Sequence, residues 1–278
     1  MTDLFLATGY SGTTAGGNEL YVATSEDGIN FAAANGNTPS LALPWRIGDS
    51  HIVKIGDHWW ACYKEDAWAG RFGLAKAASP TGAFTEVLAW HSGVTKPNVP
   101  IWLVDDDGLH ILVEQDDTRK LFEIHPLTQD QTQWGDKRNW SAPVALTGVD
   151  GNDLSDIGNF GLVRLHNTYY LVYNQYPTGV FYTRVSSALM SGWSDSASFA
   201  SPVEAMDECL GLVLLGNGKL RFYFHQNFGP AHFAVDSVAL PTDGSAGTWG
   251  TPQKLAYSGF TGDLDGTFGW FAFSRNMR

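Results

Sequence analysis

The sequence predicts an all-β fold, a five-bladed β-propeller whose first blade is completed by the C-terminal strand. Strand-like segments recur in the same order along the chain, and its two ends each carry part of one copy. The copies start about fifty residues apart, a spacing typical of propeller repeats. The alternative is a two-sheet β-sandwich in which this spacing is a coincidence.

The clearest strand of each copy, the B strand, is apolar, rich in aromatic residues and preceded by a polar turn. Period-two alternation between Gly, Asn and Asp turns is typical of strands. The predicted B strands begin at Asp3, Gly56, Asp107, His166 and Asn217. A loop and a second strand, the C strand, follow each of them. The predicted C strands begin at Glu19, Arg71, Lys120, Val180 and His232.

A further strand, the A strand, precedes the B strand in every copy except the first. These A strands begin at Trp45, Pro97, Asp156 and Asp207. The missing one is found at the other end of the chain, because LDGTFGWFAF from Leu264 to Phe273 is similar to DIGNFGLVRL and has no B strand after it. Pairing of this strand with the first B strand would close the ring and leave no large open edge.

Composition favours a single domain over residues 1–278. The apolar fraction of 44% and the aromatic fraction of 13% supply a large core, and no Ser/Pro-rich linker interrupts the chain. The net charge of −12 without a Lys/Arg cluster argues against nucleic acid and anionic membrane as partners. No apolar run has membrane-spanning length and no leader is visible, so secretion would require a leader removed earlier. Cys62 and Cys209 fall on non-adjacent blades and are predicted to be free and buried.

Strand direction indicates where a site should lie. Because A and B strands are antiparallel neighbours, the start of each A strand and the end of each B strand share one face. Carboxylates stand at or just before four A-strand starts, whereas the third copy has Asn98 in PNVP. These carboxylates belong to Asp49, Asp156, Asp207, Glu208, Asp263 and Asp265.

The B-strand ends and the loops after them carry amide, histidine and aromatic side chains. Amides both donate and accept hydrogen bonds, as recognition of sugar hydroxyls requires, and aromatic faces can stack on sugar rings. A neutral glycan also suits an acidic surface. The candidate substrate-binding residues are His51, Trp68, Gln115, Gln175, Tyr176, His225, Gln226 and Phe228. Any one of these polar residues could instead be an ordinary turn former, and His51 could serve the core.

Three segments resemble the repeats of glycoside hydrolase families 43 and 32: WRIGDSHIVKIGDHWWACY, ATSEDGINF and AKAASPTGAFTEV. The resemblance covers essentially the whole chain. It implies a five-bladed propeller that hydrolyses a glycan, of arabinofuranosidase or xylosidase type, by carboxylate acid/base catalysis. It implies that Asp265 is the base, that Asp49 orients the substrate and tunes a pKa, and that Glu208 or Asp156 is the acid.

Two other classes of function remain open. A carbohydrate-binding propeller without catalysis would keep the amides and aromatic faces and need no acid–base pair. A propeller that serves only as a protein-interaction scaffold ranks third. No cofactor or metal is predicted from the residues, because Asp105, Asp106 and Asp107 lack the further ligands of a calcium loop. Family analogy alone implies a calcium ion near the axis.

Overall fold

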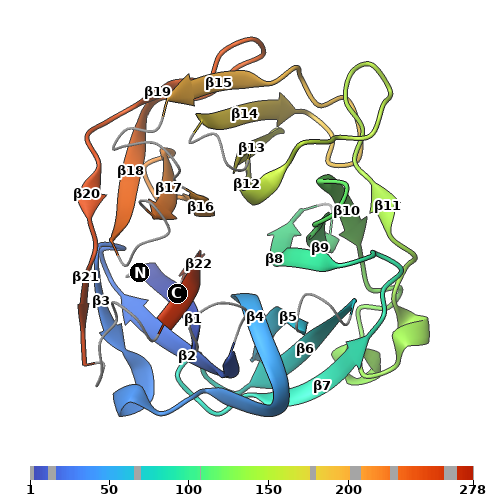
Figure 1. The fold of residues 1–278 in the computed structure, drawn as a ribbon, viewed down its shortest axis with the longest axis vertical. Coiled ribbons are helices and arrows are strands. Elements are labelled where there is room, and N and C mark those ends of the chain that lie inside the picture. Colours follow the sequence, from blue (N-terminus) through green and yellow to red (C-terminus); the bar gives the residue numbers. More distant parts are fainter. Residues whose placement is uncertain are drawn as a thin grey trace. The chain divides into compact units, whose positions relative to one another are not determined.

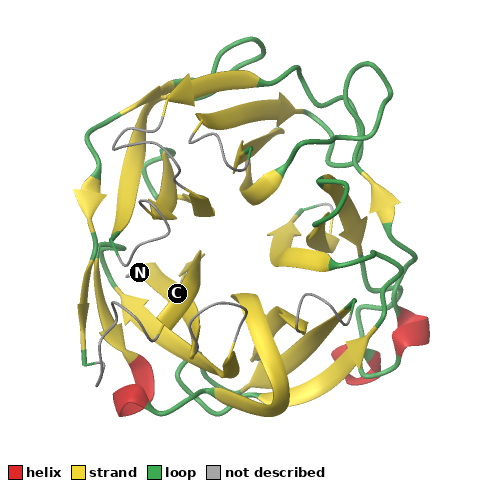
Figure 2. Cartoon of the chain, viewed as in Figure 1, coloured by secondary structure: helices red, strands yellow, loops and turns green. Residues whose placement is uncertain are grey.

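The described residues of the computed structural model form strands and three short 3₁₀ helices, η1 (Ala34–Asn37), η2 (Gln131–Gln133) and η3 (Lys137–Asn139) (Figure 2). The structure describes residues 3–11, 17–65, 70–106, 108–175, 180–200, 208–225, 231–259 and 268–277. The chain divides into two compact units. Unit 1 comprises residues 1–117, 122–144 and 256–278, and unit 2 comprises residues 118–121 and 145–255.

Unit 1 contains a nine-stranded sheet with the order β21-β3-β2-β4-β5-β6-β7, in which β1 pairs with both β2 and β22 (Figure 1). Its strands are β1 (Asp3–Ser11), β2 (Gly17–Ser25), β3 (Asn30–Ala33), β4 (Leu41–Ile55), β5 (His58–Glu65), β6 (Arg71–Ala77), β7 (Thr85–Trp90), β21 (Ala256–Ser258) and β22 (Phe268–Met277). All pairings are antiparallel except that of β21 with β3.

The predicted pairing of the C-terminal strand with the first B strand is confirmed. β22 runs antiparallel to β1 from the Asp3–Met277 pair to the Ser11–Phe268 pair. Ser274 Oγ donates a hydrogen bond of 2.7 Å to the carbonyl oxygen of Ile52 in β4. The first and last strands are therefore tied to each other and to the second copy of the repeat.

β4 is longer than the sequence predicts, because it begins at Leu41 rather than at Trp45. Its first half pairs with β2 up to Ile47, and its second half pairs with β5 from Ile47 to Ile55. Leu41 and Ile47 are both buried, so the extra residues contribute to the core. Two predicted blades consequently share one continuous sheet.

A second sheet has the order β11-β10-β9-β8. Its strands are β8 (Pro97–Asp105), β9 (Gly108–Gln115), β10 (Lys120–Ile124) and β11 (Val144–Ala145). Tryptophans dominate the core of unit 1 beside this sheet. The ring of Trp134 lies 4.7 Å from that of Trp60, 6.2 Å from that of Trp102 and 5.7 Å from that of Trp140. Such pairs add to the burial of apolar area, which is the main stabilising term.

Unit 2 contains two antiparallel sheets, with orders β12-β13-β14-β15 and β16-β17-β18-β19, and β20 pairs with β18. The strands are β12 (Gly158–Leu165), β13 (Thr168–Asn174), β14 (Val180–Ser186), β15 (Ala197–Ala200), β16 (Glu208–Leu214), β17 (Leu220–His225), β18 (His232–Ala239), β19 (Thr248–Trp249) and β20 (Gln253–Lys254). Phe181, Phe222 and Phe224 form its aromatic core, with ring centroids 4.9–5.8 Å apart.

These strands confirm the predicted A, B and C strands, and the antiparallel sheets are consistent with propeller blades. The number of blades and the single-domain organisation stay predictions. Cys62 and Cys209 are free and buried, as predicted. No helix in the described part of the chain is long and apolar enough to cross a membrane.

Candidate functional site

A largely buried polar network in unit 1 connects four strands, β4, β5, β8 and β9, around Lys64. The Lys64 Nζ lies 2.6 Å from Asp49 Oδ2 and donates a hydrogen bond of 2.7 Å to Asn98 Oδ1. Asn98 Nδ2 in turn donates to Glu114 Oε2 at 3.3 Å. One cation therefore lies between two carboxylates, with an amide as the bridge to the second.

Strand direction and local irregularities bring these four residues together. Asp49 lies in β4 and Asn98 near the start of β8, whereas Lys64 and Glu114 lie near the ends of β5 and β9. The register shifts between Gly48 and Ser50 in β4 and after Asn98 in β8. Such bulges re-aim side chains next to functional sites. The predicted shared edge of A-strand starts and B-strand ends is thus present in this part of unit 1.

Gly48 makes room for the lysine. A Cβ atom at this position would overlap Cε of Lys64, so a larger residue would push the ammonium group away from its partners. Burial lowers the pKa of Lys64, but the Asp49, Glu114 and Asp116 carboxylates outweigh burial and raise that pKa above its usual value. Lys64 therefore stays charged, and it neutralises part of the negative charge of the network.

Glu114 and Asp49 differ in their access to solvent. The Glu114 residue is 0% exposed, whereas the Asp49 side chain is 15% exposed. A substrate hydroxyl arriving at this edge would reach Asp49 and Lys64 before Glu114. The network can thus donate hydrogen bonds through the ammonium group and accept them through the carboxylates, which is the chemistry that sugar hydroxyls need.

His51 has a structural partner next to this network. Its Nδ1 accepts a hydrogen bond of 3.2 Å from the backbone N–H of Trp102, so the ring connects β4 to β8. Burial lowers the pKa of His51 to about 4. The ring is therefore neutral at pH 7 with its proton on Nε2. Its role in substrate binding stays a prediction.

A second buried cluster lies in unit 2, where Glu208 and His225 are direct cross-strand neighbours. Their Oε2 and Nε2 atoms are 3.2 Å apart, and the side chains are 10% and 2% exposed. The ring of His232 lies 6.4 Å from that of His225, edge to face. A carboxyl group with an imidazole partner can exchange a proton, so this pair has the composition of an acid–base site.

Other predicted residues of unit 2 differ in their environment. Asn174 is buried and accepts the backbone N–H of Cys209 at 3.1 Å, which joins β13 to the strand carrying Glu208. Gln175 follows it directly and is partly buried. Asp156 is exposed in a left-handed turn with φ of 61°, two residues before β12. Asp156, the other candidate for the catalytic acid, is thus more accessible to water than Glu208.

The remaining predicted site residues are mostly outside the described part of the chain. Gln115 is described, and its Nε2 donates a hydrogen bond of 2.8 Å to Asp117 Oδ1. The predicted residues that lie outside the described ranges are Asp265, Trp68, Tyr176, Gln226 and Phe228. Their roles stay predictions.

Lys64, Asn98 and Glu114 were not among the residues predicted to form the site. Their positions at an A-strand start and at B-strand ends carried the signal, because the same topological rule that selected Asp49 and Gln115 also selects them. Strand position alone placed these three residues on the predicted face, but it did not show that their side chains contact one another.

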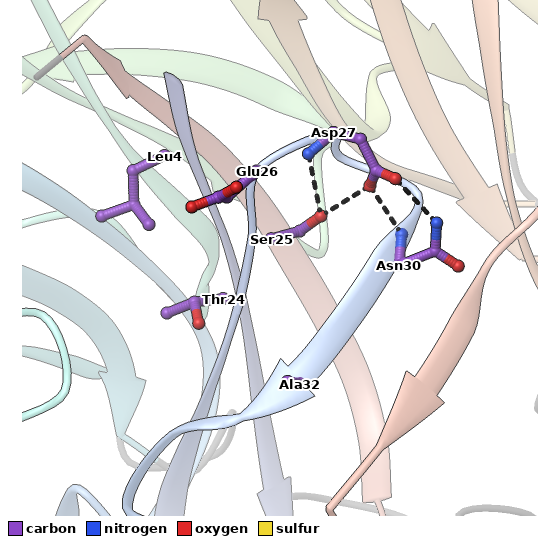
Figure 3. A pocket seen from close by; sticks show the side chains of 7 residues that line it. All are labelled: Leu4, Thr24, Ser25, Glu26, Asp27, Asn30 and Ala32. Carbon is purple, nitrogen blue, oxygen red and sulfur yellow. Dashed lines mark hydrogen bonds between the residues drawn. The ribbon is translucent and has the colours of Figure 1, made fainter. Parts of the chain in front are cut away.

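A pocket near the β2–β3 turn is lined by Leu4, Thr24, Ser25, Glu26, Asp27, Asn30 and Ala32 (Figure 3). Asp27 accepts hydrogen bonds from the backbone N–H groups of Ile29 and Asn30, both at 2.8 Å, and from Ser25 Oγ at 2.8 Å. Burial raises the pKa of Asp27, but these donors outweigh it and lower the pKa below its usual value. Residues 25–28 therefore belong to a hydrogen-bonded turn between β2 and β3.

The buried histidines predict a loss of stability in acid. Burial, followed by the charge of His225, lowers the pKa of His232 to about 3. In the unfolded chain the pKa of His232 is near 6.5, so between pH 6.5 and pH 3 the unfolded state binds a proton that the folded state does not. The free energy of unfolding therefore falls as the pH falls through this range. Between pH 6.5 and 4, the free energy of unfolding of His232→Gln should fall by about 3 kcal/mol less than that of the wild type.

Urea unfolding at successive pH values measures this difference. The exposed His58 provides the matched control, because His58→Gln should leave the slope of stability against pH unchanged. Equal slopes for wild type and His232→Gln would contradict the prediction.

Comparisons with known proteins show which fold this chain shares. No protein-family model matches the sequence, and no curated protein matches it. A family 43 β-1,3-galactosidase, solved with galactodeoxynojirimycin, has a TM-score of 0.59 and 9% identity over 88% of this chain and 90% of its own length. An exo-β-1,3-galactanase from Phanerochaete chrysosporium, solved with β-1,3-galactotriose, has a TM-score of 0.61 and 14% identity over 92% of this chain. This chain spans 61% of the galactanase's length.

A β-xylosidase designated RS223 has a TM-score of 0.60 and 11% identity over 92% of this chain and 93% of its own length. At such low identities the likeness establishes the fold alone. This all-β chain therefore shares its fold with glycoside hydrolases, including members of family 43.

Proposed function

We propose that this chain is a glycoside hydrolase-like protein that acts on an oligo- or polysaccharide. The buried Asp49–Lys64–Asn98–Glu114 network is the observation that carries the proposal. It brings two carboxylates, an ammonium group and an amide together at positions where the repeat predicts the site. The fold shared with a galactosidase, a galactanase and a xylosidase also supports a glycan-directed function.

The finer proposal is a five-bladed propeller over residues 1–278 that hydrolyses glycosidic bonds with carboxyl groups. Hydrolysis needs a protonated carboxyl group to assist the leaving oxygen and an ionised one as base or nucleophile. Asp265 is the proposed base, and Glu208 or Asp156 is the proposed acid. Asp49 suits the orienting role, because its ion pair with Lys64 holds the carboxylate in one position.

A glycan-binding protein without catalysis is the second candidate, and one observation favours it. Asp49 is held by Lys64 and Glu208 by His225, so both carboxyl groups have partners before any substrate arrives. Such groups can recognise hydroxyls without transferring a proton to a glycosidic oxygen.

Turnover assays separate the two candidates. Aryl β-galactosides, aryl β-xylosides, arabinofuranosides and β-1,3-galactan would be incubated with wild type and with Asp265→Asn, Glu208→Gln and Asp49→Asn. We expect Asp265→Asn and Glu208→Gln each to lower kcat at least about 100-fold, the scale of a lost acid or base. Asp57→Asn, at an exposed turn residue, is the control and should keep full activity.

Glycan-array binding of the same proteins completes the test. Binding without turnover on any compound would assign the chain to the glycan-binding class. Turnover that survives all three carboxylate substitutions would refute the roles proposed for Asp265, Glu208 and Asp49. Neither turnover nor glycan binding would overturn the proposal as a whole.

A further inference from the structure

Two histidines and a glutamate meet on one side of the β9–β10 pair. His110 lies in β9, Glu123 lies in β10, and His125 follows β10 directly. Nδ1 of His110 is 2.7 Å from Glu123 Oε1, and Nδ1 of His125 is 3.0 Å from Oε1 and 3.2 Å from Oε2. One potential ligand atom from each residue lies within 4.8 Å of the other two.

The carboxylate of this cluster is buried and needs a positive partner. Glu123 is 2% exposed, and the two histidines are its only ion-pair partners in the described part of the chain. A buried carboxyl group is stabilised only by the groups that contact it, and a bound cation would contact it together with both histidines.

The backbone around the cluster is fixed before any ion binds. The His125 N–H donates to Ser141 Oγ at 3.0 Å, and the Ser141 N–H donates to the His125 carbonyl oxygen at 2.9 Å. His110 is held within β9 by its pairing with Leu103 of β8. A fixed frame of this kind lowers the ordering cost of binding.

We propose that His110, Glu123 and His125 bind one divalent transition-metal ion, with Zn²⁺ as the first ion to test. Imidazole nitrogens suit Zn²⁺ and its neighbours in the first transition series, and two histidines with one carboxylate are a recurrent ligand set for such ions. Metal–ligand distances of about 2.1 Å in a tetrahedral site put the ligand atoms about 3.4 Å apart. The glutamate and histidine atoms, now 2.7–3.2 Å apart, would therefore have to separate slightly to admit the ion.

The proposed metal site is separate from the Asp49–Lys64 network and does not depend on the proposed function. Both include a residue of β9, but His110 precedes Glu114 by four positions, which is about 13 Å along a strand. The side chain of His125 is 43% exposed. Solvent or an exogenous ligand can therefore reach the remaining coordination positions of the metal.

One feature limits the affinity of the site. Binding through Nδ1 puts the ring proton of His110 on Nε2, which is buried and has no hydrogen-bond acceptor among the described residues. Metal-binding histidines usually donate this second N–H to a carbonyl or carboxylate group. We therefore expect binding about 10–100-fold weaker than at a three-ligand site whose second shell is complete.

Titration of metal-stripped protein with Zn²⁺ by calorimetry tests the proposal, with Co²⁺ absorption as a check of the ligands. We expect one ion per chain and a rise in Tm of about 5 °C at 100-fold excess over Kd. His125→Gln should weaken binding at least about 100-fold, and His110→Gln should do the same. His125 is partly exposed, so His125→Gln should fold, and circular dichroism would confirm this.

His58→Gln is the matched control, because His58 is an exposed histidine at the start of β5 and should not affect binding. Loss of binding in His110→Gln and His125→Gln, with binding retained in His58→Gln, would support the site. Absence of Zn²⁺ binding by wild type, or equal affinity in wild type and the His110→Gln/His125→Gln double variant, would overturn it.

Discussion

Lys64→Met is expected to lower the free energy of unfolding by about 3–5 kcal/mol, the cost of removing one partner from a buried ion pair. The lysine side chain is 16% exposed and its ammonium group contacts Asp49 and Asn98. Methionine keeps much of the apolar stem but supplies no charge. Asp49 and the fully buried Glu114 would then keep their negative charge after losing the cation between them.

The destabilisation should depend on Asp49. In a double-mutant cycle, Asp49→Asn should cost less in the Lys64→Met background than in wild type. Urea unfolding of the four proteins gives the coupling energy.

Two outcomes would contradict this account of the network. A loss of less than about 1 kcal/mol for Lys64→Met would place the pair in the class of solvent-screened surface salt bridges. Additive effects of Lys64→Met and Asp49→Asn would show that the two residues do not interact. Lys54→Met, at an exposed lysine of β4, controls for the general effect of removing a positive charge.

The repeated strands could be predicted from the sequence because their side-chain pattern is local. Short runs of aromatic and β-branched residues, with Gly, Asn and Asp turns between them, specify β5, β9 and β13 without reference to the rest of the chain. The pairing of β22 with β1 was predictable for a different reason. An unpaired A-type strand at one end and a missing one at the other leave a single partner that closes the edge.

The pairing of β2 with the first half of β4 could not be predicted in this way. This pairing depends on the path of the chain after η1. From the sequence, residues such as Leu41 could equally belong to a loop packed on the core. Lys64 was missed because a lysine followed by Glu65 and Asp66 is typical of a solvated strand end. Only the partners from β4 and β8 show that its ammonium group is buried.

The His110–Glu123–His125 cluster was hidden from the sequence by spacing. Thirteen positions separate His110 from Glu123, and their proximity depends on the pairing of β9 with β10 across a turn. The Glu-x-His pair alone is too common to indicate a metal site. Known zinc signatures place two ligands within a few residues on each side, and this segment has such a pair on one side only.

Gly161→Ala is expected to destabilise the protein by about 3 kcal/mol, at the upper end of the usual cost of overpacking. Gly161 is a buried residue of β12 in unit 2. A Cβ atom there would lie 2.6 Å from Cβ of Leu212 and 2.7 Å from the carbonyl carbon of Gly211, and would overlap the Leu212 backbone nitrogen. Because two of these obstacles are backbone atoms of β16, no change of rotamer relieves the overlap.

The substitution should therefore separate β12 from β16. The hydrogen bond from the Cys209 N–H to Asn174 Oδ1 connects the same two sheets, so it should lengthen as they move apart. Cys209 reports this movement, because burial raises the pKa of its thiol to about 12 and keeps it unreactive in the wild type. A thiol reagent should label Cys209 faster in Gly161→Ala, measured in a Cys62→Ser background.

Thermal unfolding gives the size of the effect, with an expected fall in Tm of roughly 6–12 °C for a chain of this length. Gly135→Ala is the matched control, because the nearest atom to a Cβ there is the Val87 carbonyl oxygen at 3.5 Å, an ordinary contact. Alanine also reduces the entropy of the unfolded chain, which favours folding by up to about 1 kcal/mol in both variants. A stable Gly161→Ala with an unchanged labelling rate would mean that β12 and β16 do not approach closely, and that glycine at this position serves only the strand itself.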